Sequence, residues 1–431
     1  MVKILNTSQS DFKIKFESLL KKREKDDESI DKIVSKIIHD VRKNSDTALL
    51  RLTNKLDKSN FKKTQDLTVK NSEFEICFQD LSSNIKKSLN TAIRRIKSYH
   101  KKQMPKNNMY RDDEGVKLGG IWNPIESVGL YVPGGKAAYP SSLIMNAVPA
   151  IVAGVKRIVV TVPAVNGEIN PVVLACCKIL GIKEVYKIGG AQAIAALAMG
   201  TKTIRKVDKI FGPGNAYVAS AKKQFFGTVG IDMIAGPSEV LIIADSKNNP
   251  DHIAIDLLAQ AEHDELAQSI LITDDKKFSE KVIKSINDFL KKLERRAIAR
   301  LSWNNFGAVI ICDNLYKSVE LINEIAPEHL EIAVEKPKRF LRKIRNAGAI
   351  FLGRYTPEAV GDYIAGPNHV LPTDRTARFC SGLNLLDYFK RSSVVECNKR
   401  NLSRIGKDAI NLAYEEGLQA HALSIECRIT K

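Results

Sequence analysis

The chain has 431 residues, with 44% hydrophobic and 27% charged residues. These values are ordinary for a globular protein with two or more domains, and they argue against a disordered or fibrous protein. The net charge of +18 is spread along the whole chain and aromatic residues make up only 6%. A nucleic-acid surface therefore stays open as an alternative, but no stacking motif or basic arm supports it.

Targeting signals and cysteine patterns are both missing from the sequence. No apolar run approaches the roughly 18 residues of a membrane-spanning helix, and the N-terminal segment lacks the apolar core of a signal peptide. The seven cysteines are scattered without a CxxC pair, which argues against a disulfide framework or a thiolate zinc cluster. We therefore expect a cytoplasmic protein in which Cys176 and Cys177 are small buried side chains of a helix.

Residues 1–118 form the first predicted part of the chain. Apolar residues recur at helical spacing over residues 30–41 and 85–99, which predicts amphipathic helices. His39 and His100 lie among charged residues, so we expect both on the surface. This part is expected to be helical, to join the first α/β domain and to contribute no chemistry.

From residue 119 the pattern changes, because short apolar strands alternate with helices of about ten residues. This alternation predicts parallel α/β structure, which we divide into domains 119–238 and 239–375. Two strand–turn–helix junctions, at 189–192 and 212–215, offer free helix N–H groups to an anion such as a pyrophosphate. The dinucleotide fingerprint GxGxxG is absent, so the pattern alone favours ordinary turn chemistry as the explanation of these junctions.

Residues 211–265 concentrate the features expected of a site. They contain two Gly-Pro turns, a buried strand predicted at Val240 to Ala244, and a predicted helix carrying Gln260 and His263. Residues three apart on a helix share one face and can bind one object. Further along, Glu328 and His329 follow a proline turn beside the apolar segment LEIAV. They offer two proton-transfer groups, although such a dipeptide alone is weak evidence.

The segments FGPGNAYV, AGPSEVLIIAD and AQAEHD closely resemble the signature of the histidinol dehydrogenase family, and the resemblance extends from about residue 119 to residue 421. It implies two incomplete Rossmann-like parallel-sheet domains with helical N-terminal and C-terminal extensions. The 119–238 domain would bind the nucleotide, the 239–375 domain would carry the metal and catalytic residues, and segment 376–431 would exchange between the subunits of a homodimer. The implied activity is the oxidation of L-histidinol to L-histidine through the aldehyde, with two NAD and one Zn²⁺ per subunit, in histidine biosynthesis.

The resemblance also implies roles for individual residues. His329 would be the general base and Glu328 would activate water. The nucleotide contacts would be Tyr131, Gln192 and Asn215. The zinc ligands would be Gln260, His263, Asp362 and His421, a set without thiolates that suits a catalytic zinc. The substrate contacts would be Ser238, Gln260, His263, Glu328, His329, Asp362, His369, Glu416 and His421.

Three alternatives to this function remain in view. A zinc hydrolase with Glu328 as its base would show no saturation with NAD. A basic nucleic-acid-binding protein would bind with a steep salt dependence. A catalytically inactive homologue kept as a scaffold is disfavoured because every matched ligand and base is present. We expect no nucleic-acid or membrane partner.

Overall fold

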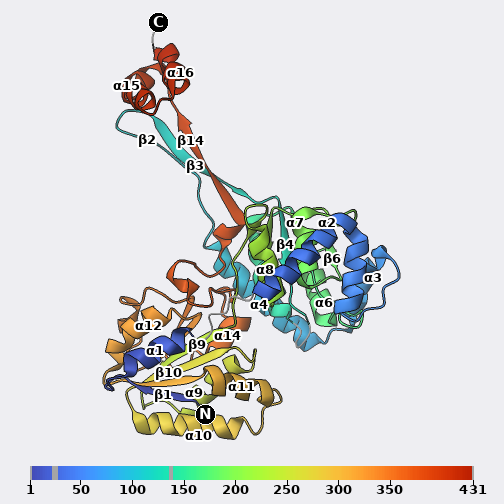
Figure 1. Ribbon diagram of the computed structural model, residues 1–431, viewed down its shortest axis with the longest axis vertical. Helices are drawn as coiled ribbons and strands as arrows, with labels where there is room; N and C mark the ends of the chain where they lie inside the picture. The colour runs from blue at the N-terminus through green and yellow to red at the C-terminus, as the bar shows by residue number, and fades with distance from the viewer. Residues whose placement is uncertain (1, 22–27, 135–138, 430–431) are drawn as a thin grey trace.

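The computed structural model describes residues 2–21, 28–134 and 139–429. Two α/β units form the body of the molecule, and a long arm projects from it and carries the last helices at its far end (Figure 1). Every helix among the described residues is too short or too polar to cross a lipid bilayer.

The first unit is built on a five-stranded parallel sheet. Its spatial order is β6 (Glu184–Tyr186), β5 (Arg157–Thr161), β4 (Ser127–Tyr131), β7 (Lys209–Phe211) and β8 (Gly230–Ile231). One face packs on α3 (Asn71–Asp80), α4 (Ser83–Lys101), α5 (Pro140–Ala153) and α6 (Pro171–Leu180). The other face packs on α2 (Glu28–Leu56), α7 (Gly190–Met199) and α8 (Ala216–Phe225). Val159 and Val160 are neighbours in β5 and enter opposite cores, as the alternation of strand side chains requires.

The second unit is built on a six-stranded parallel sheet. Its order is β1 (Lys3–Asn6), β11 (Ala308–Ile311), β10 (Gln268–Thr273), β9 (Glu239–Ala244), β12 (His329–Ala333) and β13 (Ala349–Leu352). One face packs on α1 (Phe12–Lys21), α12 (Val319–Ile325) and α13 (Lys338–Leu341). The other face packs on α9 (Pro250–Ala261), α10 (Lys276–Phe289) and α11 (Arg296–Phe306). Both faces are covered, so β9 is buried along its whole length.

The two sheets share one topology. Counted along the chain, strands β4 to β8 and strands β9 to β13 both have the spatial order 3-2-1-4-5, which is the Rossmann order without its last strand. The prediction of two incomplete Rossmann-like domains is confirmed. The N-terminal part, residues 1–118, is largely helical as expected, but residues 3–6 form β1, which pairs with β11, and residues 108–111 form β2, which pairs with β3. Local periodicity cannot reveal a strand whose partner lies so far along the chain.

Helix α4 corrects a second expectation, that His100 lies on the surface. His100 is fully buried, and its Nδ1 lies 2.8 Å from Gln103 Oε1. It continues the buried stripe of Leu89, Ala92 and Ile96 along one face of α4, so the helical spacing outweighs the charged neighbours. The prediction that Cys176 and Cys177 are buried in a helix is confirmed.

The chain between the second unit and the arm also belongs to the core of the first unit. Val370, Leu383 and Leu385 are buried there, and the Tyr388 hydroxyl donates to the Asn146 carbonyl at 2.8 Å. The arm then consists of an antiparallel sheet, with α15 and α16 packed together at its far end (Figure 1). Its elements are β2 (Asn108–Arg111), β3 (Lys117–Pro124), β14 (Phe389–Glu396), α15 (Lys399–Glu415) and α16 (Gln419–Ile429).

Candidate active site

The turn between α12 and β12 positions the two predicted proton-transfer residues. Helix α12 ends at Ile325, and Ala326 adopts a left-handed conformation with φ of 49° while its amide donates to Ile322 at 2.8 Å. Pro327 and Glu328 follow, and His329 is the first residue of β12. Glu328 and His329 are each only 5% exposed, so both groups are held away from bulk water at the amino edge of the sheet.

The start of the neighbouring strand β9 fixes both side chains. The Glu239 amide donates to Glu328 Oε2 at 2.8 Å, and His329 Nδ1 lies 2.9 Å from the Glu239 carbonyl oxygen. A carbonyl oxygen only accepts hydrogen bonds, so Nδ1 carries the proton. In its neutral form the imidazole therefore has its lone pair on Nε2, an atom that is buried and has no hydrogen-bond partner in the structure.

Asp362, in α14 (Glu358–Tyr363), is surrounded by three histidines. Its Oδ1 lies 3.7 Å from His329 Nε2, and its Oδ2 lies 3.8 Å from His263 Nε2. Its backbone carbonyl accepts from His369 Nδ1 at 2.9 Å. The structure therefore gathers His263, Glu328, His329, Asp362 and His369, and we call this group the histidine–carboxylate cluster.

The sequence predicts that one helix carries both Gln260 and His263, but only Gln260 lies in the helix. Helix α9 ends at Ala261, and His263 lies in the turn that follows. The His263 amide still donates to the Gln260 carbonyl at 3.2 Å, so the turn continues the helical path. Gln260 is 1% exposed and its Nε2 has no hydrogen-bond partner, whereas the His263 side chain is 40% exposed.

Burial and neighbouring charges set the protonation of the cluster. Burial raises the pKa of Glu328 to about 7. Burial alone would lower the pKa of His329, but the carboxylates of Glu328, Glu358 and Asp362 raise it well above its usual range. Burial raises the pKa of Asp362, but His329 and the two other histidines lower it overall. The cluster thus pairs a carboxyl group poised near neutrality with a buried imidazole. The neighbouring carboxylates favour the protonated imidazole, so His329 can act as a base only where their charge is offset.

The predicted nucleotide contacts lie at the carboxyl edge of the five-stranded sheet. Tyr131 ends β4, and its hydroxyl accepts from the Gly190 amide at 3.2 Å. Gln192 is buried in the first turn of α7, and neither atom of its side-chain amide has a hydrogen-bond partner. Asn215 caps α8 by accepting from the Tyr217 and Val218 amides at 3.1 and 3.2 Å.

A buried ion pair holds the turn that leads to α8. Gly212 has φ of 114°, and a Cβ there would lie 2.1 Å from the Tyr131 carbonyl oxygen, so only glycine fits. The Gly212 amide donates to Asp232 Oδ2 at 2.7 Å, and its carbonyl accepts from Lys222 Nζ at 3.0 Å. Lys222 and Asp232 also pair with each other. The ion pair and these two hydrogen bonds therefore fix the position of the Gly212 backbone at this edge of the sheet.

The positions of the four predicted zinc ligands show which of them could share a metal ion. Within the described parts of the chain, no three His, Cys, Asp or Glu side chains form a metal-binding group. The His263 and Asp362 donor atoms lie 3.8 Å apart and fit two ligands of an N/O site. The fourth predicted ligand, His421, is in α16 at the end of the arm.

The remaining predicted substrate residues are spread over two places. Ser238 lies directly before β9, and its carbonyl accepts from the Gln268 amide at 2.9 Å. Glu416 follows α15 and, like His421, lies at the far end of the arm (Figure 1). One chain therefore gathers the histidine–carboxylate cluster, with Ser238 and Gln260 elsewhere in the second unit, and leaves Glu416 and His421 apart.

Two carboxylates beside His329 had no role in the sequence analysis. Glu239 holds Glu328 and His329, and its Oε1 accepts from the Asp374 amide at 2.9 Å. Glu358 Oε2 is buried 3.7 Å from His329 Nδ1, and burial raises the pKa of Glu358 well above its usual range. The only sequence feature that could have pointed to Glu239 is its position next to Ser238 in the Gly-Pro turn segment. No sequence feature pointed to Glu358.

Two Rossmann-like units, one with an acid–base cluster and the other with polar groups at its carboxyl edge, define a two-domain α/β enzyme. The histidinol dehydrogenase family model matches residues 20–429. A histidinol dehydrogenase of Rhodospirillum rubrum is 51% identical over 428 residues, covering 99% of this chain and 98% of the relative. One of Agrobacterium fabrum is 52% identical over 425 residues, covering 99% and 98%. The crystal structure of histidinol dehydrogenase from Elizabethkingia anophelis superposes with a TM-score of 0.94 at 35% identity, covering 99% and 98%. The chain belongs to the histidinol dehydrogenase family, whose members are oxidoreductases of histidine biosynthesis.

Proposed function

We propose that this protein oxidises L-histidinol to L-histidine through the aldehyde, consuming two NAD and using one zinc ion per subunit. The observation that carries the proposal is the unpartnered, buried Nε2 of His329, held 3.7 Å from Asp362 beside a carboxyl group whose pKa is about 7. Each oxidation removes a hydride and a proton from the substrate. The protein must therefore supply a base twice.

His329 acts as that base. The Glu239 carbonyl keeps the proton on Nδ1, so Nε2 is the atom that takes the hydroxyl proton when the alcohol becomes the aldehyde. The same nitrogen takes the proton of the hydrated aldehyde in the second oxidation. The Glu358 carboxyl group lies 3.7 Å from Nδ1, and its ionised form favours the imidazolium.

Glu328 acts between the two oxidations, when water adds to the aldehyde. It is fixed by the Glu239 amide and lies 3.7 Å from His329 Nδ1. Its pKa near 7 makes a substantial fraction ionised at neutral pH, so it can remove a proton from the water that attacks the aldehyde. Burial of both residues limits other water in the site.

Gln260, His263, Asp362 and the partner's copy of residue His421 would hold the zinc ion. When bound, zinc supplies a Lewis acid that orients the substrate nitrogens and a positive charge that offsets the Asp362 carboxylate. Ser238, His369 and Glu416 would hold polar groups of the substrate. Because Glu416 and His421 lie on the projecting arm, the proposal requires a homodimer in which each arm completes the other site.

Tyr131, Gln192 and Asn215 would hold NAD, which accepts the hydride in each oxidation. The unpaired side-chain amide of Gln192, buried in the first turn of α7, supports that assignment. Domain 119–238 would then bind the nucleotide, and domain 239–375 would carry the metal and catalytic residues. Residues 1–118 would chiefly join the nucleotide-binding domain, and residues 376–431 would exchange between subunits.

We also propose a cytoplasmic location, without nucleic-acid or membrane partners.

The test is to count NADH formed per L-histidinol consumed by the zinc-loaded protein, before and after chelation. Two NADH per substrate, lost on chelation and regained with zinc, is the expected result. One NADH would mean that oxidation stops at the aldehyde and would remove the role of Glu328. No NADH would favour an inactive scaffold or a binding protein.

A further inference from the structure

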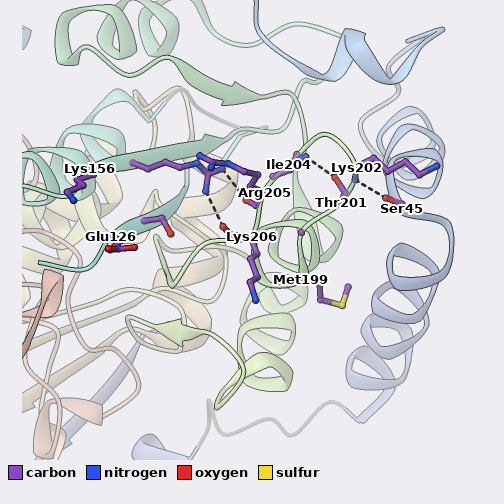
Figure 2. A pocket seen from close by; sticks show the side chains of 12 residues that line it. Ser45, Glu126, Lys156, Met199, Thr201, Lys202, Ile204, Arg205 and Lys206 are labelled. Carbon is purple, nitrogen blue, oxygen red and sulfur yellow. Dashed lines mark hydrogen bonds between the residues drawn. The ribbon is translucent and has the colours of Figure 1, made fainter.

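The open hollow at the amino edge of the five-stranded sheet brings no ligand-binding groups together among the residues that the structure describes. It has a volume of about 860 Å³ and is lined by the loop 200–206 and the starts of β4 and β5. Figure 2 shows Lys156, Lys202 and Lys206 pointing away from one another. Its buried cation, Arg157, is paired with Glu184 at 2.8 Å. A buried polar contact without an assigned role lies instead in the second unit, beside the histidine–carboxylate cluster.

Glu331 is a buried carboxyl group on the same side of β12 as His329. The two residues are two positions apart in the strand, so their side chains point to the same face of the sheet. Ala333, the next residue in this series, belongs to the core that α9 covers, so Glu331 faces α9. It is 3% exposed, and a carboxyl group buried in this way needs partners inside the protein.

The partner of Glu331 is the first amide of α14. Glu358 begins this helix, and its amide donates to Glu331 Oε1 at 2.5 Å. An amide in the first turn has no acceptor within its own helix, and Pro357, which precedes it, has no side-chain acceptor to offer. Glu358 also places its Oε2 3.7 Å from His329 Nδ1. One hydrogen bond from β12 therefore fixes the start of α14 beside His329.

The other end of α14 is held from the first unit. The carbonyls of Ile364 and Ala365, directly after the helix, accept from Arg95 Nε and Nη2 at 2.6 and 3.2 Å. Asp362 lies between the two anchored ends, about one helical turn after the amide that Glu331 binds. Because α14 has only 6 residues, a shift at its start would move the Asp362 carboxylate relative to the histidines that face it.

The contact of Glu331 with α14 does not depend on a negative charge. Burial, together with the charge of Asp256 in α9, raises the pKa of Glu331 to about 8. Burial raises the pKa of Asp256 to about 6. Near neutral pH, Glu331 is therefore mostly protonated and Asp256 mostly ionised. A protonated carboxyl group still accepts a hydrogen bond through its carbonyl oxygen, so the bond to Glu358 requires the reach of the side chain.

We propose that Glu331 is a positioning residue of the active site, whose carboxyl group fixes the start of α14 and thereby sets the distance between Asp362 and His329. This inference rests on the proposed function only for the metal-binding role of Asp362. Groups that hold metal ligands in place typically change metal affinity or activity by about 10- to 100-fold when they are lost. The loss of Glu331 should have an effect of this size.

The test separates the acceptor oxygen of Glu331 from its charge. Glu331→Gln keeps an acceptor at the same reach, whereas Glu331→Leu removes it. Asp256→Asn leaves the hydrogen bond to Glu358 intact and is the matched control. The readouts on the full chain are the zinc Kd by chelator competition, histidinol turnover, and hydrogen exchange of the α14 amides.

We expect Glu331→Leu to weaken zinc binding and turnover by at least about tenfold and to speed exchange in α14. Glu331→Gln and Asp256→Asn should stay close to wild type. Amides of β10, in the centre of the same sheet, should exchange alike in all variants, because the fold is not loosened as a whole. Should Glu331→Leu fail to fold, Glu331→Asp takes its place. Its side chain is one methylene group shorter, so it should lose zinc relative to Glu331→Gln.

Two results would overturn the proposal. Equal losses in Glu331→Gln and Glu331→Leu would mean that the charge matters and the acceptor does not. Unchanged zinc binding and α14 exchange in Glu331→Leu would mean that the helix does not depend on this contact. A wild-type protein that forms no NADH would refute the proposed function, but exchange in α14 would still decide the positioning role of Glu331.

Discussion

Removing the buried cation beneath the Gly212 turn is the most demanding test of the first unit. The side chains of Lys222 and Asp232 are 3% and 1% exposed, and Lys222 also donates to the Gly212 carbonyl at 3.0 Å. The change Lys222→Met keeps most of the volume and deletes the charge. It leaves the Asp232 carboxylate buried without the cation that is bonded to it, with the Gly212 amide still donating at 2.7 Å.

Deleting one partner of a buried ion pair costs about 3 to 5 kcal/mol, because the other charge stays buried and uncompensated. The hydrogen bond from the Gly212 amide partly compensates the Asp232 charge. We therefore expect the free energy of unfolding to fall by about 3 kcal/mol, the lower end of this range. The double change Lys222→Met/Asp232→Asn removes the stranded charge and keeps an oxygen for the Gly212 amide. It should lose only about 1 to 2 kcal/mol, the cost of the remaining hydrogen bonds.

The assay is hydrogen exchange of the amides in β7 and α8, read by mass spectrometry. The two tryptophans, Trp122 and Trp303, lie in the arm and in α11, so their fluorescence would not follow this sheet. The neighbouring change Lys223→Met is the control, since that side chain is 59% exposed and lies 3.9 Å from Asp31. It should cost at most about 1 kcal/mol. Similar losses in both single variants, or a double variant worse than Lys222→Met, would refute the reasoning.

Four further predictions concern the acid–base and metal residues. His329→Asn should abolish turnover and leave zinc content and histidinol binding, measured by calorimetry, unchanged; loss of zinc would reassign the residue. His263→Ala should lower the zinc retained after dialysis, and unchanged zinc would remove it from the ligands. Because burial raises the pKa of Glu328 to about 7, its base form appears above that pH. Aldehyde oxidation should therefore rise with pH through neutrality, and a flat profile in stopped-flow measurements would contradict its role. Mixing inactive His421→Ala with inactive His329→Asn should restore partial turnover through mixed dimers, and no rescue would exclude a shared site.

Much of the architecture was accessible from the sequence, because it depends on local patterns. Alternating apolar strands and short helices predicted the parallel sheets, since strand and helix periodicities differ over a few residues. The proline turn before an apolar segment located Glu328 and His329 at the start of β12. The individual roles of the candidate residues came from the family resemblance, since neither the spacing of Gln260 nor that of Asp362 indicates a metal ligand.

Only the tertiary structure decided which groups meet. Strand β1 joins β11, Glu239 and Glu358 lie against His329, and His100 lies on the buried face of α4. Each of these contacts joins segments whose partners are chosen by burial of the whole core, a long-range quantity that no local window contains. The separation of His421 from His329 is likewise set by the projecting arm (Figure 1). Sequence thus determined the elements and the chemical types of residue, and packing determined which residues face one another.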